Sequence, residues 1–475
     1  MIVGLEEDHQ APTDALTGFS AGPRLWLRIG QSATLPAVRE ERRELDELER
    51  RVVARIAQRE HDLVELLQTL IGFDTVTHSP GAPPRDEARL QRYLAERLAA
   101  RGAEVTVEEP DVALIADHPL VPDEFSFAGR PQLVARFASV GGGRTLLLNG
   151  HVDVVDVHPR GEWSSDPFDA VVSDGAVWGR GACDMKGGVA SMVMAAEVLA
   201  ELGVRLTGDL LVNTVTEEES TGAGGLVSAR TLRADAAIVP EPSSLDVAVA
   251  CRGSLLVAIT LEGRPGHAGT PPRHPDAGGA VSAIDKAAYL LEALRRLRDE
   301  WALRPRHLYL PAADCVTTRI SGGEWIVSYP ARCRLECHIE YLPSPGGGDP
   351  APVVRREFED WIARAAGADN WLRAHPPLVE WTQGCVPPAE ISIGEPVVRT
   401  LIGVQRALRR PGRVGGFDNW HDGAWLILEG GIPTVAFGPR ALSVAHTIDE
   451  RVPIADLVGC AQGIAVTAMR FCGVR

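Results

Sequence analysis

The sequence TLLLNGHVDVV, residues 145–155, decides the fold of this chain. Its apolar run predicts a buried strand, and His151 and Asp153 follow where that strand ends. A second stretch, GRGACDMKGG at residues 179–188, predicts a glycine-lined turn that enters a helix at Asp184. An open α/β sheet binds its ligands outside the carboxyl ends of its strands. The two stretches therefore predict a ligand site at the rim of a sheet.

The spacing of His151 and Asp153 suits a metal-binding histidine. Residues two apart in a strand point the same way, so Asp153 can accept the second ring N–H of His151 and fix its tautomer. Histidine and carboxylates together favour a divalent ion of the zinc type. Taken alone, however, the pair is more typical of a loop histidine beside a solvated carboxylate, so other acidic residues must decide.

Acidic and histidine side chains also follow other expected strands. Glu217–Glu219 come after an expected strand at 209–216, Glu241 after one at 236–239, and His446 lies in a late loop. Each alone has an ordinary explanation, such as a solvated turn or a surface histidine. Because parallel strand ends converge on one rim, we expect these residues and Asp184 to surround two metal ions about 3.5–4 Å apart.

Composition excludes several classes of protein. A length of 475 residues predicts two or three domains, and a net charge of −16 argues against nucleic acid or an anionic membrane as partner. We see no signal peptide and expect no membrane-spanning segment. The eight cysteines are scattered, which favours reduced thiols and a cytoplasmic location. The expected partner is a small molecule.

The order of expected elements predicts an α/β protein with an insertion. Alternating strands and helices over 39–251 and 385–475 predict a mostly parallel, helix-flanked sheet that forms a catalytic metal-binding domain. A β-α-β-β-α order over 252–384 predicts an inserted ferredoxin-like α+β domain, and residues 1–38 are expected to be an N-terminal extension. The expected helices include 40–74, 86–101, 188–202 and 280–303, and the expected strands include 104–108, 133–137, 254–262, 315–321 and 331–341.

Six motifs give the chain a family resemblance. It resembles the metallopeptidases and deacylases that include acetylornithine deacetylase, succinyl-diaminopimelate desuccinylase, aminoacylase and glutamate carboxypeptidases. The motifs run in the family's order from about residue 60 to the C-terminus. They are GHVD at 150–153, GRGACDMKG at 179–187, EEE at 217–219, EP at 241–242, GRPGHA at 263–268, and FGP at 437–439 followed by His446.

The resemblance implies a zinc-peptidase-like catalytic domain with two divalent ions. Zn²⁺ is the expected metal, with Co²⁺ or Mn²⁺ as alternatives. Glu218 would be the general base, Asp153 would orient His151, and a cis peptide is expected after Asp184. The implied metal ligands are His151, Asp184 as the bridge, Glu219, Glu241 and His446.

The resemblance also implies a homodimer. The inserted domain would serve as lid and dimerisation domain, and His267 would reach the partner subunit's site and help stabilise the oxyanion. One departure concerns Glu340, which stands where members that bind a substrate carboxylate often carry arginine. A second is the stretch Ser328-Tyr329-Pro330, where many members have asparagine before a conserved proline. We infer that the substrate presents a cationic or neutral group near Glu340, unless that side chain faces solvent.

The expected activity is the removal of an acyl group, such as acetyl or formyl, from a small N-acylated amine or amino acid by metal-activated water. A dipeptidase or carboxypeptidase of the same family is the first alternative. The second is a homologue that has lost catalysis and only binds a ligand. Retention of all the implied metal and base positions argues against this second alternative.

Overall fold

The computed structural model describes residues 43–77, 83–271, 273–345, 348–382 and 386–475. The expected N-terminal extension, residues 1–38, lies outside this part of the chain. Among the described residues, the largest sheet has nine strands in the order β1-β2-β6-β3-β7-β15-β8-β13, with β14 also paired to β8. The strands are β1 Glu104–Glu108, β2 Gln132–Phe137, β3 Leu146–His151, β6 Leu210–Val215, β7 Ala236–Val239, β8 Val247–Cys251, β13 Ala389–Glu390, β14 Val414–Phe417 and β15 Thr434–Ala436.

The centre of this sheet is parallel, as the sequence predicted. β3 pairs in parallel with β6 and β7, and β15 pairs in parallel with β7, whereas the β1–β2 and β2–β6 pairs are antiparallel. All six residues of β3 are buried, which is the pattern of a parallel strand covered on both faces. The carboxyl ends of β3, β6 and β7 therefore open on the same rim.

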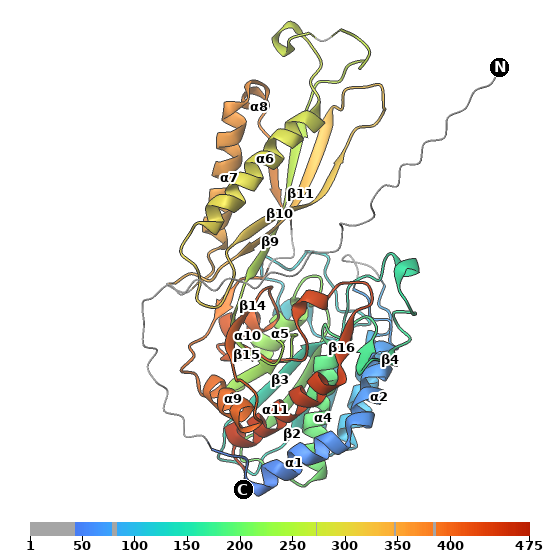
Figure 1. Ribbon diagram of the computed structural model, residues 1–475, viewed down its shortest axis with the longest axis vertical. Coiled ribbons are helices and arrows are strands. Elements are labelled where there is room, and N and C mark those ends of the chain that lie inside the picture. The colour runs from blue at the N-terminus through green and yellow to red at the C-terminus, as the bar shows by residue number, and fades with distance from the viewer. Residues whose placement is uncertain (1–42, 78–82, 272, 346–347, 383–385) are drawn as a thin grey trace, which may run out of the picture. The chain divides into compact units, whose positions relative to one another are not determined.

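Helices flank the large sheet. α1, α4 and α11 pack against one another over β3, as Figure 1 shows, while α5 and α10 form a separate pair. The helices are α1 Glu47–Gln58, α2 Glu60–Ile71, α3 Glu87–Ala99, α4 Lys186–Glu201, α5 Ala223–Thr231, α9 Pro396–Ala407, α10 Gly423–Leu428 and α11 Ile454–Cys472. Within the described residues, four short 3-10 helices lie at Val112–Leu114, Arg160–Glu162, Pro275–Ala277 and Leu442–Val444.

Two expectations about helices need correction. The continuous helix expected over 40–74 is interrupted at Arg59, whose buried guanidinium pairs with Glu197 of α4 at 3.0 Å. We also expected no segment long and apolar enough to span a membrane. Judged by length and composition alone, this expectation is wrong. Helix α11 passes that test with a mean hydropathy of 1.3, but 78% of the stretch is buried against other helices of the core.

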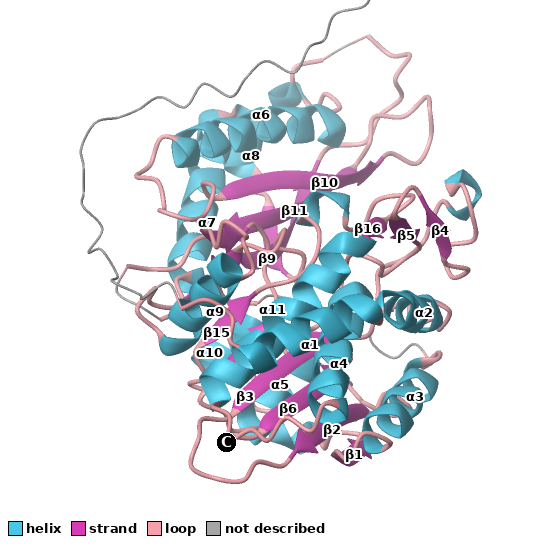
Figure 2. Cartoon of the chain, turned by 60° about the horizontal axis from the view of Figure 1, so that its bottom comes forward, coloured by secondary structure: helices cyan, strands magenta, loops and turns pink. Residues whose placement is uncertain are grey.

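A second sheet is built between Gly253 and Trp381. Its order is β10-β11-β9-β12, and all its pairs are antiparallel. This is the arrangement of a ferredoxin-like fold, with a fourth strand, β12, that the sequence reading missed. Figure 2 shows α6 and α7 beside this sheet, and they share its apolar core. The elements are β9 Gly253–Glu262, β10 Asp314–Gly322, β11 Arg332–Tyr341, β12 Leu378–Trp381, α6 Ala283–Ala302, α7 Ala351–Ala368 and α8 Asn370–Ala374.

A third, three-stranded sheet holds two loops of the site together. β4 (Val171–Ser173) pairs with β5 (Ala176–Trp178), which pairs in turn with β16 (Arg451–Pro453). The turn that leads to Asp184 follows β5, and the loop that carries His446 precedes β16. The small sheet thus joins two segments that are more than 250 positions apart in sequence.

Candidate metal centre

His151 lies at the end of β3 and is almost completely buried, with 1% of its surface exposed. Its Nδ1 is 2.9 Å from the backbone carbonyl oxygen of Asp153. A carbonyl only accepts hydrogen bonds, so Nδ1 carries a proton, and the neutral form of the ring therefore has its lone pair on Nε2. This tautomer is the one that a histidine needs to bind a metal through Nε2.

The carboxylate of Asp153 does not hold His151 as the sequence suggested. Its nearest oxygen is 3.8 Å from Nδ1, while the two oxygens accept backbone N–H groups of Glu218 at 3.4 Å and Glu219 at 3.0 Å. Asp153 therefore orients His151 through its main chain. Its side chain fixes the loop after β6 that carries the two glutamates.

Asp184 lies between the two histidines of the site. Its Oδ1 is 3.2 Å from Nε2 of His151, and its Oδ2 is 3.4 Å from Nε2 of His446. Each carboxylate oxygen thus faces a different imidazole, which is the geometry of a ligand that bridges two ions. The peptide bond to Met185 is cis, as the family resemblance implied.

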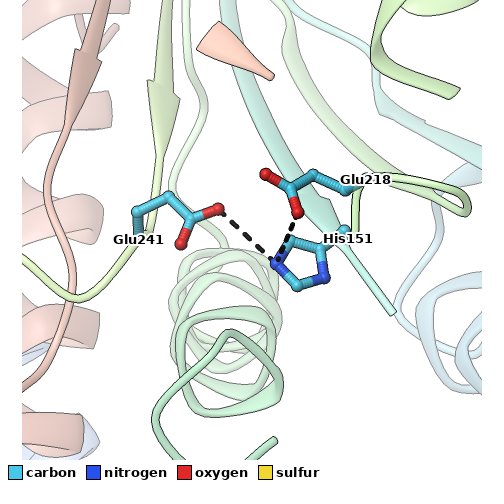
Figure 3. Close-up of side chains that lie close together, drawn as sticks. All are labelled: His151, Glu218 and Glu241. Atoms are coloured by element: carbon cyan, nitrogen blue, oxygen red, sulfur yellow. Dashed lines mark ion pairs between the residues drawn. The ribbon is translucent and has the colours of Figure 1, made fainter. Parts of the chain in front are cut away.

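Three glutamates complete the cluster. His151 lies between Glu218 and Glu241, and its Nε2 is 3.7 Å and 3.6 Å from their nearest oxygens (Figure 3). On the other side, Glu219 Oε2 is 3.2 Å from Nε2 of His446. The side chains form two overlapping groups around Asp184, one with His151 and Glu241 and the other with His446 and Glu219.

The cluster fits a pair of divalent cations. Oε1 of Glu241 is buried, and no described residue gives it a hydrogen bond. Burial raises the pKa of Glu218 and of Glu241 well above their usual values, and neighbouring carboxylates raise them further. Burial opposes the charged form of His446, but Glu219 and Asp184 outweigh it and raise its pKa to about 11. These shifts report an excess of buried negative charge that metal cations would neutralise.

Two predicted residues lie outside the cluster. His267 is exposed on a loop after β9, where its Nδ1 accepts the backbone N–H of Gly269 at 3.0 Å. Glu340 forms an ion pair with Arg252, and only 15% of the surface of the Glu340 side chain is exposed. The structure therefore gives each of them a local partner, and neither joins the metal groups formed by the described residues.

Sequence reasoning missed Asp422, which follows β14 at another strand end. It is 1% exposed, and neither carboxylate oxygen has a hydrogen-bond partner among the described residues. Burial raises the pKa of Asp422 to about 8, and the charge of Asp422 helps to raise the pKa of Glu218 and Glu241. Its position after a strand, before Gly423, was the signal that could have revealed it.

The comparisons with known proteins agree with this geometry. The chain is 30% identical over 444 residues to N-formyl-4-amino-5-aminomethyl-2-methylpyrimidine deformylase of Halalkalibacterium halodurans, covering 89% of this chain and 97% of that protein. The deformylase of the same name from Bacillus subtilis is 29% identical over 423 residues, covering 85% and 93%. The fold is similar to that of human carnosine dipeptidase 1, with a TM-score of 0.68 at 15% identity, covering 90% of this chain and 100% of that one.

The match to a family extends over most of the described chain. Residues 147–470 match the model of peptidase family M20/M25/M40 and include every residue of the metal cluster. Together with the deformylase relatives, the site identifies a metal-dependent hydrolase that removes an acyl group from a small N-acylated amine. The chain belongs to peptidase family M20/M25/M40.

Proposed function

We propose that this protein is a cytoplasmic dizinc deacylase that hydrolyses the formamide or acetamide of a small amine. The position of Asp184 between His151 and His446 carries the proposal. Two groups of candidate metal ligands share Asp184, and Glu218 lies at their edge. Seven cysteines in the described part of the chain are buried and free, which supports a reducing compartment.

The donor set supports zinc. His151, Glu241 and Asp184 would hold one ion, and His446, Glu219 and Asp184 the other. Two imidazoles with carboxylates suit Zn²⁺, and they also accept Co²⁺ or Mn²⁺. When bound, two such metal ions would polarise the amide carbonyl as Lewis acids and would lower the pKa of the attacking water to near neutrality.

The position of Glu218 supports its role in moving the proton. It is 6% exposed, and Asp153 holds its main chain, so its carboxylate is fixed beside His151. It would take the proton from the attacking water and return it to the nitrogen of the leaving amine. A carboxylate whose pKa is raised by burial is a stronger base than one in water, which suits both transfers.

The pair formed by Glu340 and Arg252 supports a substrate without a carboxylate. The family resemblance places an arginine at position 340 in members that bind a substrate carboxylate. Here Arg252 compensates the charge of Glu340, so the pair offers no free cation to an acid and no free anion to an amine. We infer that the substrate is a neutral ring amine, and the two deformylase relatives are named for an N-formylated aminopyrimidine. The first substrate to test is therefore the formamide of a small heteroaromatic amine.

A homodimer would complete the site. β10 is an edge strand of the second sheet, and it exposes Val316 and Ile320 at 40% and 54%. Trp325, 67% exposed, lies in the loop beside His267. Because Nδ1 of His267 accepts a hydrogen bond, its Nε2–H is the free donor that an oxyanion requires. A single molecular mass equal to that of one chain in light scattering would contradict the dimer.

A substrate panel tests the reaction. The metal-free protein is assayed with Zn²⁺, Co²⁺ or Mn²⁺ on N-formyl and N-acetyl amines, their α-carboxylate analogues and dipeptides. We expect fastest hydrolysis of a formyl or acetyl amine that lacks a carboxylate. Faster cleavage of dipeptides would show a peptidase, and two bound ions without any hydrolysis would show a binding homologue.

A variant of Glu218 tests the assigned base. We expect Glu218→Gln to keep two ions per chain and to lose roughly 10²–10⁴ in kcat, the usual contribution of a general base. The matched control is Glu162→Gln, a change at an exposed glutamate, which should leave kcat unaltered. Equal kcat for the two variants would overturn the role of Glu218.

A further inference from the structure

Glu450 is a buried carboxylate that touches the main chain of the bridging ligand. It is 0% exposed, and its Oε1 accepts the backbone N–H of Cys183 at 2.7 Å and that of Asp184 at 3.0 Å. Two N–H donors on one carboxylate oxygen fix the backbone from which the Asp184 side chain projects. Glu450 is therefore one contact away from the proposed metal bridge.

Arg180 connects this carboxylate to the loop of His446. Its Nη1 donates to Oε2 of Glu450 at 2.7 Å and to the carbonyl of Thr447, next to His446, at 3.3 Å. Its Nη2 donates to the carbonyl of Asp156 at 2.9 Å, and its guanidinium lies 5.0 Å from the centre of the Trp163 ring. The fork geometry of arginine lets one side chain join three loops at once.

The two ligand groups of the site differ in how firmly the fold holds them. His151 is the last residue of the central strand β3 and Glu241 follows the central strand β7, and they are 1% and 2% exposed. The His446 side chain is 45% exposed on a loop, and its own backbone has a φ of 58°. The first group inherits its geometry from the sheet, whereas the second needs a local support.

We propose that Glu450 and Arg180 are a positioning pair that controls occupancy of the metal position formed by His446, Glu219 and Asp184. The inference rests on the proposed dimetal function. The pair holds the backbone of Asp184 and the backbone next to His446 at a fixed separation. Loss of the pair selectively weakens binding of the ion at this position and leaves ion binding at His151 and Glu241 intact.

Glu450→Gln is the sharpest perturbation, because it keeps the size of the side chain. An amide offers only one acceptor oxygen. If that oxygen stays on the Cys183 and Asp184 N–H groups, the NH₂ group faces the donor on Arg180. The hydrogen bond between Arg180 and residue 450, which connects the two loops, is then lost. Arg180→Lys is a milder second variant, since it keeps the charge but cannot reach three partners with one planar fork.

Metal titration of the stripped protein by calorimetry measures the effect. The wild type should bind two Zn²⁺ per chain. In Glu450→Gln and in Arg180→Lys we expect the weaker ion to bind about 10–100-fold less tightly, the usual effect of losing a group that supports a metal ligand. The tighter ion should change by less than about threefold. With two equivalents of Co²⁺ per chain, the absorption spectrum of the variants should correspondingly lose the contribution of one ion.

The control is Glu49→Gln, at a buried pair of the same types in which Arg470 contacts both carboxylate oxygens at 2.7 Å and 2.8 Å. This pair joins α1 to α11 and touches no residue of the metal cluster. Its loss should lower the melting temperature without altering either metal affinity. Equal loss of both ions in Glu450→Gln, or no more loss than in Glu49→Gln, would overturn the positioning pair. A wild type that binds fewer than two ions would instead overturn the proposed function.

Discussion

The carboxylate of Asp153 accepts two main-chain hydrogen bonds, whereas its backbone carbonyl contacts His151. This separation of roles can be tested. Asp153→Asn leaves the backbone carbonyl of residue 153, so the hydrogen bond from Nδ1 of His151 is retained. What changes is the acceptor for the N–H groups of Glu218 and Glu219. If the carboxylate acts on the glutamate loop, the variant should keep its metal at His151 and lose activity.

The magnitude follows from counting acceptors. The carboxylate has an oxygen for each N–H, whereas asparagine has one oxygen and one NH₂ group. One buried N–H of the loop therefore loses its acceptor. That loss costs about 1–3 kcal/mol, which is roughly a 5- to 150-fold fall in kcat/KM if it displaces Glu218 from its working position.

The assay compares kcat/KM for an N-formyl amine with the affinity of the tighter metal ion. We expect the first to fall by that factor and the second to change by less than about threefold. The control is Asp156→Asn, at a nearby carboxylate that is 67% exposed, which should leave both unchanged. Loss of the metal at His151 with normal activity per bound ion would refute the reasoning, because it would mean that the carboxylate serves His151.

Three further predictions follow from the same structure. Gly188→Ala puts a Cβ 2.0 Å from the carbonyl oxygen of Pro240 and should lower the free energy of unfolding, measured by urea titration, by about 1–3 kcal/mol. Gly367→Ala, with open space around the new Cβ, should instead raise the free energy of unfolding by about 0.5–1 kcal/mol. Burial lowers the pKa of His421 from 6.5 to about 4, so the unfolded chain alone binds that proton between these values and stability should fall by up to ~3 kcal/mol as the pH drops through this window. His421→Asn, which retains an acceptor for the N–H of Gly423, should flatten this dependence, and an unchanged slope would contradict it. Removal of the ions with a chelator should lower the melting temperature, since each ion present at 100 times its Kd stabilises the fold by about 2.7 kcal/mol, and equal melting curves would argue against metal binding.

The sequence alone was sufficient for the parallel sheet and for the residues at its rim. A run such as Leu146–Leu148, buried on both faces, leaves few alternatives to a central strand, and His151, Glu218 and Glu241 follow strands whose ends must converge. The ferredoxin-like order was also readable, because its strands alternate and its helices are long. These features follow from local sequence periodicity, so they can be predicted without knowing which distant residues are in contact.

Tertiary contacts decided what local patterns do not encode. The first expected helix is interrupted at Arg59, whose guanidinium pairs with Glu197 on another helix. Asp153 uses its carboxylate on a loop some 65 positions away rather than on its neighbour His151, and Glu340 is neutralised by Arg252. Spacing along a chain fixes which way a side chain points, but its partner is whichever group the fold brings within hydrogen-bonding distance. The residue types of the site were therefore set by the sequence, and the division of work among them by the packing of the fold.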